Sequence, residues 1–549
     1  MWPPKDASVF IVGAGPVGLT LAMDLAWRGI NVTVAETRAR SEPPPPKCNH
    51  VSARSMEVFR RLGVAGKLRN AGLPPDYPND ISYRTSFTGK ELTRIPIPCR
   101  RDRYHSTDGP DTGWPTPEPP HRINQIYLEP ILFDHAAQMS KITLLTRIAV
   151  TAMTQDADQV TATLENLDTG EISLIHCQYL VGCDGGSSII RKSIGAQLEG
   201  DAIISRNQST YVRAPGLVKL QKETPAWATF SLNPRRSGNV YAIDGVERWI
   251  IHNYLRPDEE DFEAIDRDWS IRTILGVDDE FEYEILAKED WYGRRLVADK
   301  FRDRRAFICG DAAHIWVPYG GYGMNAGIAD AMNLSWLLAG HLNRWAPASI
   351  LDAYEAEPLP ITQQVSHFVM NHAHAMVSQR GGVPKNLEDE GPAGDTARAK
   401  LGQQAYHLNV QQYCAAGLNF GYYYENSPII DHNSASGETA PGYSMADYTP
   451  CTVPGCRMPH AWLGNPRHGR SLYDALGPEY TLVRTNADID IEPLLIAASE
   501  VGLPLALLDV EDVDYDYPLI ICRPDQHIAW RGTGAPTEPI QLLQQLGGH

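Results

Sequence analysis

The sequence predicts an α/β protein in which a parallel-sheet domain is joined to a separate antiparallel sheet and to a compact C-terminal domain. Three observations predict this class. A glycine-rich turn, Gly13-Ala14-Gly15-Pro16-Val17-Gly18, separates an apolar strand from a helix, and alternating apolar and polar residues recur through 227–254. The length of 549 residues corresponds to about three domains at roughly 150 residues each.

The first elements form a βαβ unit. Ser8–Val12 is a short apolar strand, Gly18–Trp27 is a helix, and Asn31–Ala35 is a second strand followed by Glu36. The third glycine of the turn lets the helix pack closely on the strand, and the helix N-terminus can hold a pyrophosphate. Because the Glu36 carboxylate can accept hydrogen bonds from a ribose, the unit predicts dinucleotide binding. It does not decide between FAD and NAD.

Residues 9–23 are apolar enough to suggest a signal peptide or a membrane span. Three glycines and Asp24 interrupt that reading, and the segment is shorter than the ~20 apolar residues that cross a bilayer. We therefore expect a buried strand and helix here, and no membrane as a partner.

The remaining elements follow from helix breakers and hydrophobic periodicity. Prolines end regular structure, a period of two residues indicates half-buried strands, and a period near 3.6 indicates helices. The last hundred residues show a βαβ-type pattern. In chain order we expect a loop at Ser41–Pro46, a helix at Ser52–Leu62, a surface loop at His105–His121, a helix at Gln125–Ala137, antiparallel strands at Trp227–Leu232, Asn239–Ile243 and Arg248–Tyr254, a long helix at Ala326–Asn343, a mobile loop at Gly381–Gly394, and apolar strands at Tyr480–Val483 and Leu519–Cys522.

Charge and cysteine content exclude several classes of protein. The net charge of −18 is spread along the chain, which argues against nucleic acid as a partner. The 43% hydrophobic and 21% charged content is that of an ordinary globular protein. Nine cysteines lie far apart without a CxxC pair, a pattern typical of a reduced cytoplasmic protein rather than of a disulfide framework. We expect no bound metal.

Residues 309–331 carry the strongest functional signal. The apolar run Ala306–Ile308 is followed by Gly310 and Asp311, then by Pro318, a cluster of glycines, and a helix start at Met324-Asn325. Such an arrangement places the Asp311 carboxylate near ribose hydroxyls. It also points the free N–H groups of a helix N-terminus toward an electron-rich group.

Together with the glycine-rich turn and Glu36, this segment resembles the flavoprotein aromatic hydroxylases, the single-component FAD monooxygenases that include the para-hydroxybenzoate and phenol hydroxylases. Tyr179–Arg191, with Asp184 at its centre, resembles the DG motif of that family, and Gly310-Asp311 resembles its GD motif. The motifs follow the family's order over about residues 7–370. The resemblance implies a GR2-type, Rossmann-like FAD-binding fold, FAD as the cofactor and NAD(P)H as the reductant.

The resemblance also assigns positions along the cofactor. Gln125, with Glu129, fits a pattern in which the glutamine approaches FAD. Lys47 stands where an arginine is common, and Thr37 stands where an arginine often follows the ribose glutamate, with Arg38 one step later. The implied cofactor-binding residues are Gly13, Gly15, Gly18, Glu36, Lys47, Gln125, Asp184, Arg248, Gly310, Asp311, Pro318, Gly321, Gly323, Met324 and Asn325.

The catalytic residues are assigned in the same way. Pro318 falls where the family presents a carbonyl beside the substrate ring. Several relatives carry an aspartate or histidine five residues before Arg54 that helps to deprotonate a phenol, but Asn49 occupies this position and cannot act as a base. The proton acceptor is left open between His50, near its unperturbed pKa of ~6.5, and His252 on the second sheet. Core or pocket-wall positions are expected at Trp227, Thr229, Ile250 and Tyr254.

The tail resembles the thioredoxin-like domain that ends many phenolic hydroxylases. Pro454–His460 and Arg523–Arg531 carry this resemblance, which begins near Tyr443. Four residues separate Cys451 from Cys456, whereas a redox-active dithiol of the thioredoxin type needs the close CxxC turn that lowers a thiol pKa. We therefore expect the C-terminal domain to be structural.

The resemblance to the family also predicts how the chain is divided into domains. Arg54 and Glu57 fit the family's helix after the first loop, and Gly421–Pro428 resembles a family segment in the arm that follows the catalytic part. The expected domains are an FAD-binding domain at 1–80, 121–200 and 290–370, a substrate-binding β-sheet domain at 81–120 and 201–289, a helical and loop arm at 371–440, and the thioredoxin-like domain at 441–549.

The implied function is hydroxylation of a small phenolic or aromatic-acid substrate with NAD(P)H and O₂, through a flavin C4a-hydroperoxide, in a cytoplasmic homodimer. Two alternatives stay open: an FAD monooxygenase or epoxidase that acts on a non-aromatic polyketide or isoprenoid, and a catalytically silent flavin-binding sensor. A flavin halogenase is disfavoured because the chain has no WxWxIP stretch. Substrate-stimulated consumption of NAD(P)H separates the enzyme from the sensor.

Overall fold

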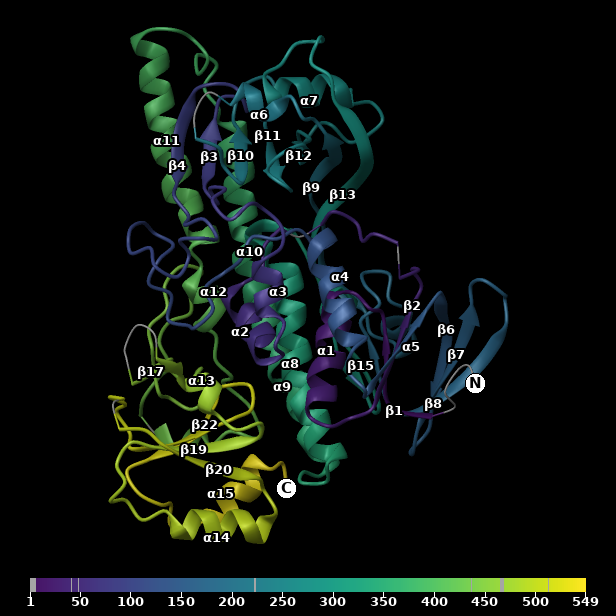
Figure 1. Cartoon of the computed structure of the whole chain (residues 1–549), viewed down its shortest axis with the longest axis vertical. Helices are drawn as coiled ribbons and strands as arrows, with labels where there is room; N and C mark the ends of the chain where they lie inside the picture. The colour runs from purple at the N-terminus through teal and green to yellow at the C-terminus, as the bar shows by residue number, and fades with distance from the viewer. Residues whose placement is uncertain are drawn as a thin grey trace.

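The computed structural model describes residues 6–40, 42–47, 49–221, 224–435, 437–464, 469–511 and 513–549, so that Ser41 of the expected proline-rich loop lies outside the described residues. Within these ranges the chain builds two eight-stranded sheets, a helical arm and a small C-terminal sheet. In Figure 1 the second sheet lies at the top, the first sheet at the lower right, and the C-terminal domain, in yellow, at the lower left. Among the described helices, none is long and apolar enough to cross a membrane.

Parallel pairing of buried strands forms the centre of the first sheet. Its strands are β1 (Asp6–Val12), β2 (Val32–Glu36), β5 (Ile142–Thr146), β6 (Ile148–Gln155), β7 (Val160–Asn166), β8 (Ile172–Gly182), β14 (Arg302–Asp303) and β15 (Ala306–Ile308). β1 lies between β2 and β8 and is parallel to both. Val9, Phe10 and Ile11 are fully buried, as expected for a strand whose two faces are both covered.

Helices beside this sheet begin at identifiable caps. They are α1 (Pro16–Trp27), α2 (Ala53–Arg61), α3 (Ala65–Arg69), α4 (Gln125–Ala136), α5 (Ile189–Ser193) and α8 (Tyr322–Leu342). Ser52 caps α2 and Asn124 caps α4, each by accepting a hydrogen bond from a backbone N–H in the first turn. Pro16 occupies the first position of α1, where an N–H would have no partner in the helix.

A buried carboxylate joins three of these helices. Asp24 of α1 accepts hydrogen bonds from Arg28 of the same turn region, from Arg61 of α2 and from Ser335 of α8. Burial alone would raise the pKa of Asp24, but the two arginines hold that pKa well below its usual value. A carboxylate with a depressed pKa stabilises the fold above its unfolded pKa and loses this contribution as the pH falls through the folded value.

The second sheet is assembled from segments that are distant in sequence. In spatial order its strands are β16 (His314–Trp316), β13 (Glu284–Ala298), β9 (Leu198–Arg213), β12 (Arg248–Tyr254), β11 (Gly238–Ala242), β10 (Ala228–Ser231), β3 (Ile81–Arg84) and β4 (Glu91–Ile95). The helix α7 (Arg267–Leu275) covers one face, where Ile274 packs directly against Gly238. The short helix α6 (Leu217–Leu220) follows β9. The opposite face is left for contacts with the first domain and the arm.

One stretch, residues 306–325, belongs to both sheets and is referred to below as the shared segment. Its first part, β15, pairs in parallel with β8 of the first sheet. After the turn η1 (Gly310–Ala312), β16 pairs antiparallel with β13 of the second sheet. A second turn, η2 (Tyr319–Gly321), then leads into α8.

The arm consists of helices that follow α8. They are η3 (Ala348–Asp352), α9 (Ala353–Ala356), α10 (Pro358–Gly381), α11 (Pro392–Tyr413), α12 (Ala416–Phe420) and η4 (His432–Ala435). The loop expected at Gly381–Gly394 is shorter than predicted, because residues 392–394 already form the first turn of α11. Leu387 is fully buried, and Arg398 donates to the carbonyls of Leu387 and Asp389, so the loop is held against α11.

The C-terminal domain has the thioredoxin-like arrangement that the sequence predicted. Its elements are β17 (Trp462–Leu463), β18 (Arg470–Ser471), α13 (Leu472–Ala475), β19 (Tyr480–Arg484), α14 (Glu492–Val501), β20 (Leu505–Asp509), β21 (Leu519–Cys522), β22 (Ile528–Gly532) and α15 (Pro539–Leu546). β19, α14 and β20 form a parallel βαβ unit, and β21 and β22 form an antiparallel hairpin beside it. Cys451 and Cys456 hydrogen-bond each other despite their wide spacing, which lowers the pKa of Cys451 to about 6.

The expected strands and helices are confirmed, and their ends agree within two residues apart from α8. α8 begins four residues before the expected Ala326, because Gly320 and Gly321 adopt positive φ and complete the preceding turn. The prediction of a surface loop at His105–His121 is wrong for its second half. Residues 116–121 are buried, since Glu118 pairs there with Arg60 and Arg69.

A buried ion pair docks the C-terminal domain on the rest of the chain. Both oxygens of Glu357, between α9 and α10, accept from Arg523 at 2.6 and 2.7 Å, and neither side chain is exposed. Arg523 also binds Asp525, while Asn333 of α8 and Ser427 of the arm donate to Glu357. Removing one partner of such a pair leaves the other charge buried and uncompensated.

We therefore expect Glu357→Gln to lower the free energy of unfolding by about 3–5 kcal/mol. The matched control is Asp509→Asn, which removes one partner of the two-point pair with Arg484 on the surface of the same domain. That pair is exposed to solvent and should contribute at most about 1 kcal/mol. Urea unfolding followed by circular dichroism measures both variants. Equal losses in the two would show that the Glu357 pair does not secure the domain.

Candidate active site

The glycine-rich turn leaves room for a ligand at its centre. Gly13 adopts a φ of +105° and lies against the backbone of Cys183, and a Cβ on Gly18 would overlap the carbonyl oxygen of Gly13. Close packing of β1, α1 and the end of β8 therefore requires both glycines. A Cβ on Gly15 would meet no atom. This residue faces open space at the N-terminus of α1, where a pyrophosphate can approach the backbone.

A chain of polar side chains runs from Glu36 to Gln125. Glu36 accepts from the backbone N–H of Ala14 at 2.8 Å and pairs with Arg38. Arg38 also pairs with Glu129 of α4, to which Gln125 donates at 3.0 Å. The acid expected at the ribose and the glutamine expected near FAD thus belong to one network.

The segment around Asp184 is linked to the turn of Asp311 by hydrogen bonds to backbone groups. Oδ2 of Asp184 accepts from the N–H groups of Ile189 and Ile190 at the start of α5. Its Oδ1 is buried and lacks a hydrogen-bond partner among the residues that the structure describes. Arg191 then donates to the carbonyl of Ala312 in η1, which ties α5 to the turn that carries Asp311.

Asp311 combines exposure with an unusual electrostatic setting. Its carboxylate is exposed and accepts no hydrogen bond from any described residue, yet desolvation by the surrounding protein raises its pKa, while the nearby His314 and Lys47 act in the opposite direction. Lys47 itself pairs with Glu289 of β13 at 2.6 Å. An unpaired carboxylate in such a recess can accept hydrogen bonds from the hydroxyls of a ligand.

The start of α8 is shaped by two glycines. Gly320 and Gly321 adopt φ of +71° and +63°, between the exposed Pro318 and the first turn of α8. The first N–H groups of a helix have no partner within it, so those of Gly323 and Met324 are donors directed out of the helix end. They can stabilise negative charge on a ring that lies against the helix end.

The side chain of Asn325 fastens this helix end to the loop before α2. Its oxygen accepts from the N–H of Ser52 and the hydroxyl of Ser55, at 2.9 and 2.8 Å. Its amide donates to the carbonyls of His50 and Gly321. All four hydrogen bonds are internal, so the side chain of Asn325 positions the loop and leaves only its backbone for a ligand.

These features fit FAD. The motif segments meet where Gly310 packs against Val17 of the glycine-rich turn and against Gly327 of α8. Around that point lie the open space at Gly15, the unpaired carboxylate of Asp311 and the N–H groups of α8. They could hold a phosphate, accept hydrogen bonds from hydroxyls and donate to the pyrimidine edge of a flavin.

The face of the second sheet opposite α7 presents one rung of paired side chains. From β13 to β3 the cross-strand partners are Glu289, Ser209, His252, Asn239, Phe230 and Tyr83. Residues paired directly across neighbouring strands point to the same face. Lys47 binds Glu289 at the β13 end of the rung, so this face begins beside the predicted cofactor loop. Arg248 lies exposed at the edge, where it hydrogen-bonds Tyr127 of α4 and Tyr211 of β9.

Aromatic rings line this face. Tyr83 stacks on Phe230 with ring centroids 5.0 Å apart, and Tyr241 contacts Trp227 at the same distance. Tyr241 also meets the ring of His252 edge to face. Tyr413 of α11 closes on Trp227 from the arm. The face is therefore a wall of rings, and Trp227 belongs to it, which agrees with the expected core or pocket-wall position.

His50 lies where the turn η2, called the cofactor turn below because the sequence resemblance assigns Gly321 to the cofactor, meets this wall. A Cβ on Gly321 would come within 2.9 Å of the His50 Cβ, so the turn and the histidine are in direct contact. Arg122 donates from its guanidinium to Nδ1 of His50, which fixes the ring proton on Nε2 in the neutral form. The same guanidinium stacks over Trp227, 4.5 Å from the ring centroid. Asn49, next to His50, accepts from Asn124, the cap of α4.

Neither histidine titrates near neutral pH. Burial, reinforced by the charges of Arg122 and Arg103, lowers the pKa of His50 well below 6.5. The expectation that His50 keeps its unperturbed pKa is therefore wrong, because it lies in a desolvated and positively charged setting. Burial also lowers the pKa of His252 to about 4. The hydrogen-bond and ring partners of His252 are Ser209, Tyr241 and Trp291, all on the second sheet.

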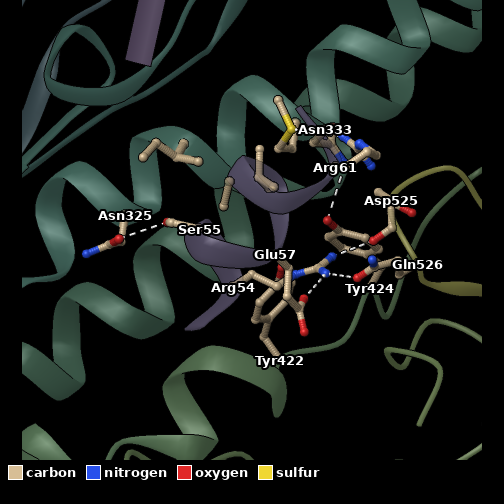
Figure 2. A pocket seen from close by; sticks show the side chains of 14 residues that line it. Arg54, Ser55, Glu57, Arg61, Asn325, Asn333, Tyr422, Tyr424, Asp525 and Gln526 are labelled. Atoms are coloured by element: carbon tan, nitrogen blue, oxygen red, sulfur yellow. Dashed lines mark hydrogen bonds and ion pairs between the residues drawn. The ribbon is translucent and has the colours of Figure 1, made fainter. Parts of the chain in front are cut away.

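Arg54 and Glu57 are brought together with the arm and the C-terminal hairpin, as Figure 2 shows. Arg54 donates to Glu57, to the side chain of Gln526 and to the backbone carbonyl of Asp525. Tyr422, from the segment expected in the arm, lines the same small cavity. With about 30 Å³ of space, this cavity can hold a water molecule but not an aromatic ring. The junction is a structural contact between domains.

Several residues of the site have no clear signal in the sequence. The site includes Arg122, Tyr413, Tyr83 and Trp291, which come from a loop, the arm and two strands. No spacing relates these positions to His50. Only the proximity of Arg122 to Gln125 in sequence could have drawn attention to it.

Known proteins match the chain along its length. The family model described as FAD binding domain matches residues 6–369, and the model described as aromatic-ring hydroxylase, C-terminal, matches residues 451–547. The chain is 28% identical to the FAD-dependent monooxygenase apdD of Emericella nidulans, with 99% of this chain and 90% of that protein covered. It is 27% identical to a phenol 2-monooxygenase of a Pseudomonas species, with 98% and 92% covered.

A solved structure agrees with these matches over the whole fold. The rebeccamycin biosynthetic enzyme RebC with reduced flavin superposes with a TM-score of 0.89 at 31% identity, covering 100% of this chain and 99% of that chain. The extent of these matches, together with a cofactor strip that fits FAD, shows that the chain belongs to the single-component FAD-dependent monooxygenases of the aromatic-ring hydroxylase family.

Proposed function

We propose that this monooxygenase hydroxylates a phenolic or aromatic-acid substrate, with NAD(P)H as the reductant and O₂ as the oxidant. The observation that carries the proposal is the contact between the cofactor turn and the wall of rings. Gly321 packs on His50, His50 accepts from Arg122, and Arg122 stacks over Trp227. A flat ring held against this wall lies next to the turn where we assign the flavin pyrimidine and the carbonyl of Pro318.

The residues of the site position the ring and exclude water. FAD, once bound and reduced, supplies the activated oxygen atom. Aromatic side chains favour offset or edge-to-face contacts with a substrate ring, which fixes its orientation. The hydrogen bonds of Asn325 and Asn124 hold the loop of Asn49 and His50 in place beneath it. Such positioning keeps the reacting atoms within reach of each other.

The proton whose loss controls the reaction is assigned to the substrate hydroxyl. A phenolate donates more electron density to its ring than a phenol, so loss of the hydroxyl proton favours oxygen transfer. His50 and His252 have lowered pKa values and stay neutral at physiological pH, so neither takes up a positive charge there. We infer that the pKa of the substrate hydroxyl, lowered by nearby positive charge, sets the pH dependence of the reaction.

A larger polycyclic substrate of the polyketide type is the second candidate. The rung from Glu289 to Tyr83 crosses six strands, which at about 4.8 Å between neighbours corresponds to roughly 24 Å. This length exceeds that of a single ring and favours a substrate with several fused rings. A substrate panel that includes phenols, aromatic acids and polycyclic phenols decides between the two.

The first prediction from the proposed function concerns turnover. We expect a true substrate to raise NAD(P)H oxidation by at least about tenfold and to gain one oxygen atom, detected by mass spectrometry. Substrate-linked oxidation limits the wasteful formation of hydrogen peroxide. If every ring in the panel leaves the oxidation rate and the product mass unchanged, the aromatic assignment fails.

A second prediction concerns the cofactor. Asp311→Ala removes a carboxylate whose charged hydrogen bonds are typically worth about 1.5–3 kcal/mol, so the Kd for FAD should rise roughly 10- to 150-fold. Fluorescence of released FAD after dialysis measures retention. Asp488→Ala, at an exposed carboxylate in the C-terminal domain, is the control. Equal retention in both variants would remove Asp311 from the cofactor site.

A third prediction concerns pH. Since His50 and His252 remain neutral above their lowered pKa values, His50→Gln and His252→Gln should keep the apparent pKa of the wild-type enzyme in profiles of kcat/KM between about pH 5.5 and 9. The rates themselves are expected to fall, because both side chains hold neighbours in place. Loss of one limb of the profile in either variant would identify that histidine as the proton acceptor.

A further inference from the structure

The region around His50 contains one more buried positive charge than negative charge. Arg103 and Arg122 are both buried, and the acid that faces them is Asp111. Asp111 is committed to Arg103, which donates to it at 2.5 Å, and to the indole N–H of Trp114 at 2.8 Å. His50 is neutral there. One guanidinium charge therefore lacks a counter-charge in this part of the described chain.

Arg122 is the residue without a partner acid. It is only 4% exposed and forms no ion pair with a described carboxylate. One of its terminal nitrogens donates to His50, while the other, NH2, is buried without a hydrogen-bond partner among the described residues. Stacking over Trp227 and Tyr413 offsets part of the desolvation cost. A buried guanidinium nitrogen without an acceptor is costly for a protein to maintain.

We propose that Arg122 is the anion-binding residue of the substrate pocket and pairs with a carboxylate or phenolate oxygen carried by the aromatic ring. This inference rests on the proposed function and narrows its substrate class to rings with an anionic oxygen. The free nitrogen of Arg122 accommodates that oxygen, the rings of Trp227 and Tyr413 flank it, and the contact with His50 sets its distance from the cofactor turn. A guanidinium is suited to planar oxyanions because its fixed donors match their geometry.

Binding can be measured without turnover. The probes are a hydroxynaphthoate, its primary carboxamide and its methyl ether, titrated into the oxidised FAD-bound enzyme and followed by the flavin difference spectrum without NAD(P)H. We expect the hydroxynaphthoate to bind at least about tenfold more tightly than one of the two neutralised forms. Weaker binding of the carboxamide identifies a carboxylate as the partner of Arg122. Weaker binding of the methyl ether identifies a phenolate.

Variants separate this role from a structural one. Arg122→Gln keeps a donor for His50 but removes the charge, so it should abolish the preference for the hydroxynaphthoate over its neutralised forms. The affinity for the neutralised forms and the retention of FAD should stay unchanged. Arg122→Lys should keep part of the preference. The control is Arg213→Gln, at an exposed arginine of β9 that pairs with Glu247, and it should behave as wild type.

Thermal stability gives an independent readout. Because Arg122→Gln relieves an uncompensated buried charge, the melting temperature of the ligand-free holoenzyme should not fall and is expected to rise. Equal binding of all three probes to the wild type, or binding of none, would overturn the proposal. So would an unchanged preference in Arg122→Gln, or a lower melting temperature with a loss of FAD. Absence of hydroxylation with intact anion preference would instead count against the proposed function alone.

Discussion

Three backbone pairs between β16 and β13, from Arg295 with Trp316 to Val297 with His314, anchor the chain just after Asp311 and just before Pro318. On the other side of Asp311, β15 is locked in register with β8. Few residues remain between the two ladders, and a slip by one residue would turn every side chain of β16 to the opposite face. The turn η1 thus cannot shift relative to either sheet without breaking one of the two ladders, and Asp311 takes its position from this double register.

The helix α2 extends the same restraint to the C-terminal domain. At its start, Ser52 and Ser55 bind the side chain of Asn325 in α8. One turn later, Arg54 binds the backbone and side chain of the hairpin at Asp525 and Gln526. Since the loop of His50 leads directly into α2, a domain remote from the chemistry secures the base of the pocket. We therefore propose a mechanical role for this domain, one that does not require its thiols.

Local signals predicted the elements well because most of them have local causes. The cap at Ser52, the proline at the start of α1 and the alternation of β12 depend on neighbouring residues. A set of cofactor residues could be proposed from the sequence for a related reason, since glycine-rich turns and strand-end acids are set by short sequence patterns. The substrate side was not, because the environment of a side chain is a property of the fold. The pKa of His50 is lowered by burial and by the charges of Arg122 and Arg103, and nothing in the sequence relates the positions of these arginines to His50. Residues 116–121 appear loop-like and exposed until the arginines that pair with Glu118 are placed.

The shared segment also divides the second sheet into two parts with different freedom to diverge. Strands β16, β13 and β9 are tied by their pairing to the shared segment, so substitutions or insertions there are expected to disturb the proposed flavin site as well. Strands β12, β11, β10, β3 and β4 lie farther along the sheet and carry His252, Tyr241, Phe230 and Tyr83, which line the proposed substrate face. Substitutions can accumulate in β12, β11, β10, β3 and β4 while β16, β13 and β9 stay unchanged. A lineage of such enzymes can therefore acquire new ring preferences without rebuilding the machinery that handles oxygen.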